Sequence, residues 1–145
     1  MSAPLYNQQI LRLAASTPAT RLSAPMASIE KRSPVCGSRV TVDVDVDRDG
    51  RVAAIGMLVR ACALGQASAT LMAADAVGKS PAELAAARDA LTAWLAGAGA
   101  MPDWPGIDIF TPALPHSARH ASIRLAFEAV TEAAAVASAN AQAAA

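Results

Sequence analysis

The strongest constraint on the fold is a stretch of alternating apolar and polar residues that begins at position 39. Valines occupy positions 40, 42, 44 and 46, and threonine or aspartate occupies the positions between them. This alternation predicts an antiparallel strand with one face on the core. Asp49-Gly50 is typical of a hairpin turn. We therefore predict paired strands at residues 39–47 and 52–59, and the second strand turns four residues toward the core: Ala53, Ile55, Met57 and Val59.

Helical patterns surround this hairpin. Apolar residues recur at spacings of three and four, which predicts helices at 4–15, where Tyr6, Ile10 and Leu13 share a face, and from residue 117 onward. The pattern also predicts a helix at 62–78, and Ser80 with Glu83 forms a capping box that opens another helix, at 80–96. Residues 27–32 suit a short strand, 17–27 a loop, and 107–110 a strand or a turn. This order predicts an α+β domain over residues 1–132. The alanine-rich tail at 133–145 either extends the last helix or frays.

The overall charge excludes some classes of partner. Twelve basic and twelve acidic residues cancel in a chain of 145 residues, which gives no sign of a nucleic-acid partner.

We expect no signal peptide, because the first twenty residues hold no long apolar run, and we expect no membrane span. Two cysteines are too few for a disulfide framework. These features predict a cytoplasmic protein.

Cys62 is the first candidate for chemistry. It lies where a strand pattern ends and a helix begins, and the positive end of a helix favours a thiolate, the form of cysteine that binds metals. Cys36 precedes the hairpin, so strand pairing brings the two cysteines together. The soft metal ligands of the chain are Cys36, Cys62, His116 and His120. Cys62 as a small buried hydrophobe is the alternative interpretation. No glycine-framed nucleophile signature indicates a Cys–His enzyme.

The aspartates near the hairpin turn resemble half of a calcium-binding loop. Residues 45–50 supply its first positions, but position twelve, which needs a bidentate carboxylate, is Gly56. The flanking segments are also strands rather than helices. We therefore interpret the aspartates as a solvated strand face.

The order of these motifs resembles the U-type iron–sulfur cluster assembly scaffolds (IscU, SufU and the N-terminal domain of NifU). The residues that carry the resemblance are Tyr6 with Ile10, residues 34–37 around Cys36, the spacing to Cys62, residues 67–69 and 78–80, Leu114-Pro115, and His120 with residues 122–123. The resemblance implies a small α+β domain with a three-stranded antiparallel sheet and helices packed on it. It implies a non-enzymatic scaffold that binds an iron–sulfur cluster or iron, with zinc as a further metal. The implied ligands are Cys36, Cys62 and His120.

Two departures from the family pattern affect this site. Ser38 stands where the family has aspartate, and the third family cysteine falls at Ala121 or Ser122, depending on the alignment register. The fourth donor is then water, Ser38, Ser122, a partner's thiol or a small molecule. The resemblance implies a cysteine desulfurase and recipient apo-proteins as partners, and leaves the oligomeric state open. The alternative is an interaction or regulatory protein that kept the fold and lost cluster assembly.

Overall fold

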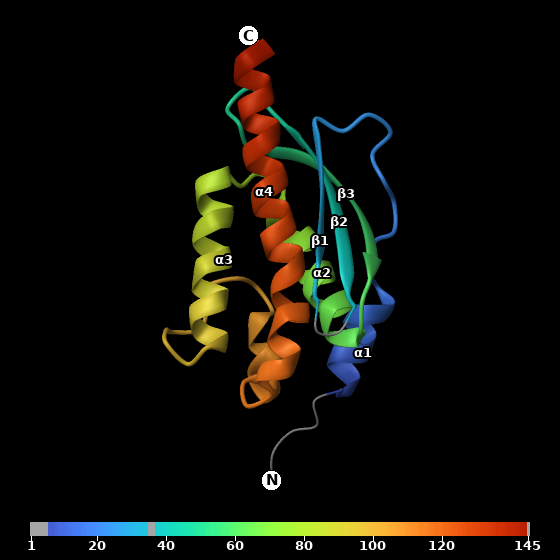
Figure 1. The fold of residues 1–145 in the computed structure, drawn as a ribbon, viewed down its shortest axis with the longest axis vertical. Helices are drawn as coiled ribbons and strands as arrows, with labels where there is room; N and C mark the ends of the chain where they lie inside the picture. Colours follow the sequence, from blue (N-terminus) through green and yellow to red (C-terminus); the bar gives the residue numbers. More distant parts are fainter. Residues whose placement is uncertain (1–5, 35–36, 145) are drawn as a thin grey trace.

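The computed structural model describes residues 6–34 and 37–144, and these form an α+β fold built on one antiparallel sheet. Its strands lie in the order β1 (Ala27–Arg32), β2 (Arg39–Val46) and β3 (Val52–Arg60). Figure 1 shows α4 running along the sheet and α3 on the outer side of α4. The predicted three-stranded sheet with packed helices is confirmed. The remaining elements are α1 (Gln8–Ala15), α2 (Ala63–Ala76), α3 (Pro81–Leu95), the 3-10 helices η1 (Ile107–Ala113) and η2 (Ser117–Arg119), and α4 (His120–Ala144).

Strands β2 and β3 form the hairpin that the alternating pattern predicts. Val42 lies opposite Met57, and both side chains are buried. In the turn, the Gly50 N–H donates to the Asp47 carbonyl oxygen at 3.0 Å. Gly50 has a φ of +80°, which glycine adopts without a steric penalty. The predicted Asp-Gly turn is therefore confirmed.

A β-bulge near this turn changes which residues of β3 face the core. Asp45 pairs with Ala54 but Val46 pairs with Val52, so Ala53 is an extra residue on β3. A bulge interrupts the alternation of faces. As a result Val52 is buried and Ala53 is exposed, and the prediction that Ala53 faces the core is wrong. The other three predicted residues do pack on the core: Ile55, Met57 and Val59.

The polar face of β2 is solvated only in part: Asp47 and Asp49 near the turn are exposed, as predicted, but residues 17–26 cross the middle of the face. The Asp43 side chain is fully buried. Arg21 donates to both of its carboxylate oxygens, from Nε at 2.6 Å and from Nη2 at 2.9 Å. The Ser28 hydroxyl and the Leu22 N–H also donate to it, at 2.7 and 3.1 Å. The Arg21 guanidinium, assisted by these donors, holds the pKa of Asp43 below its ordinary value. Asp43 therefore ties this loop to the sheet.

Helix α2 is joined to β3 at both of its ends. It follows β3 directly, and beyond its last turn the Gly78 N–H donates to the Val52 carbonyl oxygen at 2.8 Å. The Val52 N–H in turn donates to the Lys79 carbonyl oxygen at 2.9 Å. Gly78 has a φ of +92°, as expected for a glycine that follows a helix. The apolar stripe expected for this helix is buried: Leu64, Ala67 and Leu71.

Helix α3 begins with the predicted capping box. The Ser80 hydroxyl accepts a hydrogen bond from the Glu83 N–H, and the Glu83 carboxylate accepts one from the Ser80 N–H, both at 3.1 Å. Arg51 Nη1 lies 2.6 Å from the same carboxylate. The Ser80 backbone donor and then Arg51 lower the pKa of Glu83 from its ordinary value, because both stabilise the charged form.

Helix α4 packs against the sheet, α2 and α3, so it forms the centre of the helical layer. It extends through the alanine-rich segment to Ala144 rather than fraying, and Ala133 and Ala137 are fully buried. It crosses position 132 without a break, and the proposed division of the chain there stays a prediction. No helix within residues 6–34 and 37–144 has the length and apolar character to cross a membrane. The predicted core face of α4 is fully buried: Ile123, Phe127, Val130 and Ala134.

Two other predicted elements differ from the structure. Helix α1 starts at Gln8, because the Asn7 side chain caps it by accepting from the Ile10 N–H at 3.0 Å. Tyr6 precedes this cap and is 39% exposed, so the prediction that it shares a helix face with Ile10 and Leu13 is wrong. Positions 4 and 5 of the predicted helix lie outside the described residues. Residues 107–110 form neither of the predicted alternatives but begin the 3-10 helix η1.

Candidate functional site

The first turns of α2 and α4 meet at one end of the sheet, where two serine side chains touch. The Oγ atoms of Ser38, just before β2, and Ser122, in α4, are 3.2 Å apart. Both residues are buried, at 3% and 1% exposure. Arg39 pairs with Arg60, so Ser38 lies beside the point where β3 leads into α2. We call this contact the Ser38–Ser122 junction.

Gly65 allows the two helices to approach each other at the junction. A Cβ on this residue would lie 2.7 Å from the Ala61 Cβ and 3.3 Å from the Ser122 carbonyl oxygen. Further along the same interface, the Ser68 hydroxyl donates to the Ile123 carbonyl oxygen at 2.6 Å. Small residues of α2 therefore hold the start of α4 in place.

Cys62 occupies the N-cap of α2, as the sequence predicts. Its backbone is extended, with φ −64° and ψ 171°. Its thiol is free of any disulfide and makes no capping hydrogen bond within the described part of the chain. The residue is half-buried and packs on the edge of the core. This partial exposure fits a ligand better than the alternative of a fully buried small hydrophobe.

His120 opens α4, and a backbone carbonyl orients its ring. Nε2 lies 2.9 Å from the Ala113 carbonyl oxygen, and the residue is 7% exposed. Because a carbonyl oxygen only accepts hydrogen bonds, Nε2 carries the proton, and in the neutral ring Nδ1 keeps the lone pair. Metal-binding histidines are commonly held in this way through their other ring nitrogen. His116, by contrast, is exposed at the start of η2.

The structure brings two of the three predicted ligands to the starts of neighbouring helices. Cys62 precedes α2 and His120 begins α4, and these helix starts meet at the Ser38–Ser122 junction. Cys36 lies outside the described residues, so its approach to Cys62 stays a prediction. Within residues 6–34 and 37–144, no three histidine, cysteine, aspartate or glutamate residues form a group that would hold a metal ion. The complete ligand set therefore remains a proposal.

The junction distinguishes the two positions considered for the missing thiol. Ser122 directs its hydroxyl to Ser38, whereas Ala121 is half-buried beside it in the sequence. The family pattern drew attention to both serines but did not predict that they touch. No local signal could predict this, because the two residues are 84 positions apart.

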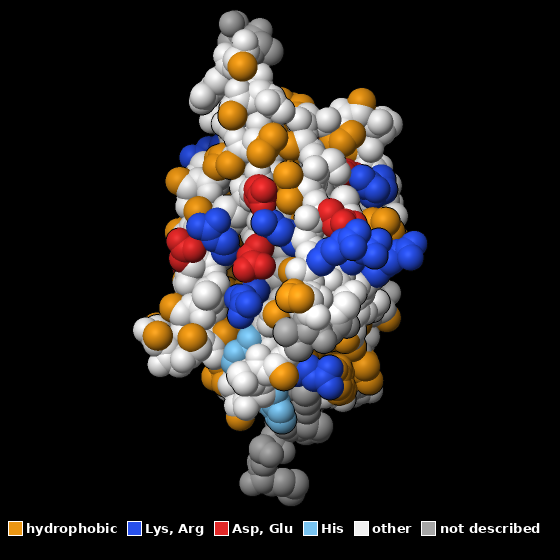
Figure 2. Space-filling model, in the orientation of Figure 1, with side chains coloured by type: hydrophobic (Ala, Val, Ile, Leu, Met, Phe, Trp, Pro, Cys, Tyr) orange, Lys and Arg blue, Asp and Glu red, His pale blue; other side chains and the backbone are white. Residues whose placement is uncertain are grey.

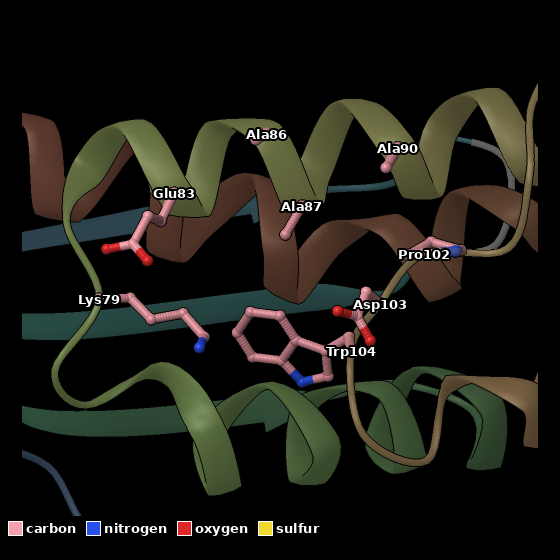
Figure 3. Close-up of a pocket in the computed structure, with 8 residues that line it drawn as sticks. All are labelled: Lys79, Glu83, Ala86, Ala87, Ala90, Pro102, Asp103 and Trp104. Atoms are coloured by element: carbon pink, nitrogen blue, oxygen red, sulfur yellow. The ribbon is translucent and has the colours of Figure 1, made fainter.

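A separate hollow lies away from the junction. It has a volume of about 420 Å³ and lies between α3 and the segment that precedes η1 (Figure 3). Lys79 Nζ lies 5.0 Å from the centre of the Trp104 ring, so the protein's own cation covers a face of this indole. The described residues that line the hollow include no cysteine or histidine. The hollow therefore does not compete with the junction as a metal site.

Comparison with known proteins places the chain in a family. No family model and no curated protein matches the sequence. The crystal structure of the N-terminal part of a nitrogen-fixing NifU-like protein from Brucella abortus is 39% identical and has a TM-score of 0.84, and the match covers 91% of this chain and 93% of that one. This chain belongs to the NifU-like N-terminal family.

Two further structures share the fold of this NifU-like chain. One is a candidate iron–sulfur cluster assembly scaffold for the SUF system from Fervidobacterium islandicum AW-1, with 17% identity, a TM-score of 0.81, and coverage of 90% of this chain and 96% of that one. The other is described as a hypothetical protein, with 21% identity, a TM-score of 0.70, and coverage of 90% and 99%. The predicted resemblance to U-type scaffolds is confirmed, and the fold is that of non-enzymatic assembly scaffolds.

Proposed function

We propose that this NifU-like protein is an assembly scaffold that carries an iron–sulfur cluster, or iron, as its cargo at Cys36, Cys62 and His120. The observation that supports it best is the meeting of the α2 and α4 starts at the Ser38–Ser122 junction. Because of this contact, the half-buried Cys62 lies at the same end of the sheet as His120, whose ring is oriented by the Ala113 carbonyl oxygen. Thiolates donate charge to a soft metal, and a neutral imidazole supplies a nitrogen donor.

This ligand set is incomplete for a closed tetrahedral site. It offers three strong donors, whereas iron and zinc in such sites take four. Ser38 and Ser122 are weak donors to a soft metal as long as they are neutral. Cargo should therefore be held less tightly than the about 10–16 kcal/mol of closed structural zinc sites. An open site suits a scaffold that receives sulfur from a cysteine desulfurase, takes up iron separately, and passes its cargo to recipient apo-proteins.

Anaerobic reconstitution tests the proposal. The reduced protein is incubated with ferrous iron and sulfide, or with zinc alone, and bound metal is measured by absorbance and elemental analysis. We expect Cys36→Ala, Cys62→Ala and His120→Ala each to lower the bound iron. His116→Ala is the matched control, because His116 is an exposed histidine near the same helix start. If the His120 and His116 variants bind equal amounts of iron, His120 is not a ligand.

Adding a thiol tests the geometry of the junction. We expect Ser122→Cys to tighten binding of the cluster or of zinc, because its side chain lies in the junction. Ala121→Cys adds the same thiol one position earlier and serves as the comparison. A gain in affinity only in Ala121→Cys would show that the side chain at position 121, and not the one at position 122, faces the bound metal.

The second candidate function is an interaction protein that uses the scaffold fold without cargo. The buried hydrogen bond between Ser38 and Ser122 favours it, because one neutral hydroxyl donates to the other there without a metal. A wild-type protein that binds neither iron, cluster nor zinc under reducing, anaerobic conditions would support this second function and end the first.

A further inference from the structure

Three arginines form a row across the sheet at the end where Cys62 lies. Arg32 of β1 pairs with Arg39 of β2, and Arg39 pairs with Arg60 of β3. Residues paired directly across an antiparallel sheet point to the same face. Adjacent strands lie about 4.8 Å apart, so this arginine row spans about 10 Å. Arg60 precedes Cys62 by two residues, which places the row beside the candidate site.

The arginine row carries more positive charge than its neighbours neutralise. Glu30 is the carboxylate next to it, with its oxygens 2.9 Å from Arg32 Nε and 3.7 Å from Arg39 Nε. Among the described residues, no carboxylate lies within ion-pair distance of Arg60. Like charges directly opposite each other weaken strand pairing. The sheet itself therefore gains nothing from this arrangement.

The row is open to a partner. The side chains of Arg32 and Arg39 are 63% and 43% exposed, and Arg60 is also exposed. The row lies on the face of the sheet opposite α4, because the valines that alternate with Arg39 face the helix layer. By contrast, Lys31 points to the α4 side, where it forms an ion pair with Glu132. Figure 2 shows basic side chains, with acidic ones among them, over the part of the molecule where Figure 1 draws the strands.

We propose that the arginine row is a docking surface for an acidic segment of a partner protein. Guanidinium groups bind carboxylates through paired, charge-assisted hydrogen bonds. A width of about 10 Å matches one segment of polypeptide, whereas nucleic-acid binding rests on many phosphate contacts along a longer basic surface. The net charge of zero and the presence of Glu30 beside the row also favour a protein partner. This inference goes beyond the scaffold proposal and does not depend on bound cargo.

Fluorescence anisotropy with a labelled decaglutamate peptide tests the docking surface on the metal-free protein at low ionic strength. We expect the triple variant Arg32→Gln, Arg39→Gln, Arg60→Gln to weaken binding by about tenfold or more, because it removes the charge-assisted contacts. A control triple variant, Arg12→Gln, Arg48→Gln, Arg88→Gln, makes the same change in net charge at other places and should change affinity by less than about twofold. Circular dichroism verifies that both variants are folded.

Two further variants keep the result decisive. Arg60→Gln alone removes the arginine that has no ion pair among the described residues, so it should weaken binding without disturbing the fold. Cys62→Ala should bind the peptide as the wild type does, which separates this surface from the cargo site. Equal losses in the two triple variants, or no binding of the peptide at all, would overturn the proposal. Row-dependent binding of a labelled oligothymidine in preference to the peptide would also overturn it, in favour of a nucleic-acid surface.

Discussion

Replacing Gly65 with alanine tests how tightly α2 packs at the junction, both against Ala61 before the helix and against Ser122 of α4. Within a helix, alanine is favoured over glycine by up to about 0.8–1.0 kcal/mol, and Gly65 is the third residue of α2. Helix propensity alone therefore predicts that Gly65→Ala raises stability. The structure predicts the opposite, because the new Cβ would lie 2.7 Å from the Ala61 Cβ and 3.3 Å from the Ser122 carbonyl oxygen.

The expected size of the effect follows from these two contributions. Inserting a methyl group into a well-packed site costs about 1–3 kcal/mol, and more when the neighbouring atoms cannot move aside. The Ala61 Cβ is attached directly to the backbone, so the cost should lie at the upper end of that range. After the gain in helix propensity is subtracted, we expect a net loss of about 1–2 kcal/mol. For a chain of this size that corresponds to a fall in Tm of roughly 3–8 °C.

Thermal and urea unfolding, followed by circular dichroism, measure this loss. Ala74→Gly, at an exposed position of the same helix, measures the propensity scale in α2 and should lower stability by about 1 kcal/mol. An increase in Tm for Gly65→Ala, combined with a loss for Ala74→Gly, would show that the helices have room at Gly65. The packing argument for the junction would then be wrong.

Three other substitutions have definite expected outcomes. Asp43→Asn should destabilise the fold by about 1–3 kcal/mol near neutral pH. Folding lowers the pKa of Asp43, so the stabilisation from its carboxylate is complete above the unfolded pKa of about 3.9 and is lost as the pH falls through the pKa of the folded state. The urea midpoint of Asp43→Asn should therefore depend less on pH in the acid range than that of the wild type. Ser80→Ala removes the N-cap of α3 and should cost about 1 kcal/mol in urea unfolding; no loss would mean that the cap adds nothing. Trp104→Phe removes the indole hydrogen bond to the Leu71 carbonyl oxygen, and its loss of about 0.5–1.5 kcal/mol should appear as a lower Tm.

The sequence predicted the sheet well because its signals are local. The valine alternation and the Asp-Gly turn specify the hairpin through neighbouring residues, and Ser80 with Glu83 specifies a helix start in the same way. The error at Ala53 arose where a single bulge shifted the register, and the alternation pattern does not reveal a bulge. The burial of Asp43 was not predicted, because its partner, Arg21, lies in a loop without periodicity.

The candidate site was predictable in its residues but not in its contacts. Cys62 at a helix start follows from the change of pattern at that position. The tautomer of His120 depends on Ala113, and the junction depends on Ser38 meeting Ser122, and both contacts require the tertiary fold. The arginine row became visible only with the strand register, although the predicted hairpin already placed Arg39 and Arg60 near its open end.

The hydrogen bonds between Val52 and the segment after α2 would limit how far Cys62 could move if it holds the proposed cargo. Strand, helix and these bonds make a closed loop of backbone, and Cys62 stands at the corner of the loop opposite the bonds. Displacing its sulfur through the backbone would require the helix and the strand to shift together. If both residues hold the proposed cargo, Cys62 would be fixed by this backbone loop. His120 would be fixed by a different means, the contact of its ring with the Ala113 carbonyl oxygen.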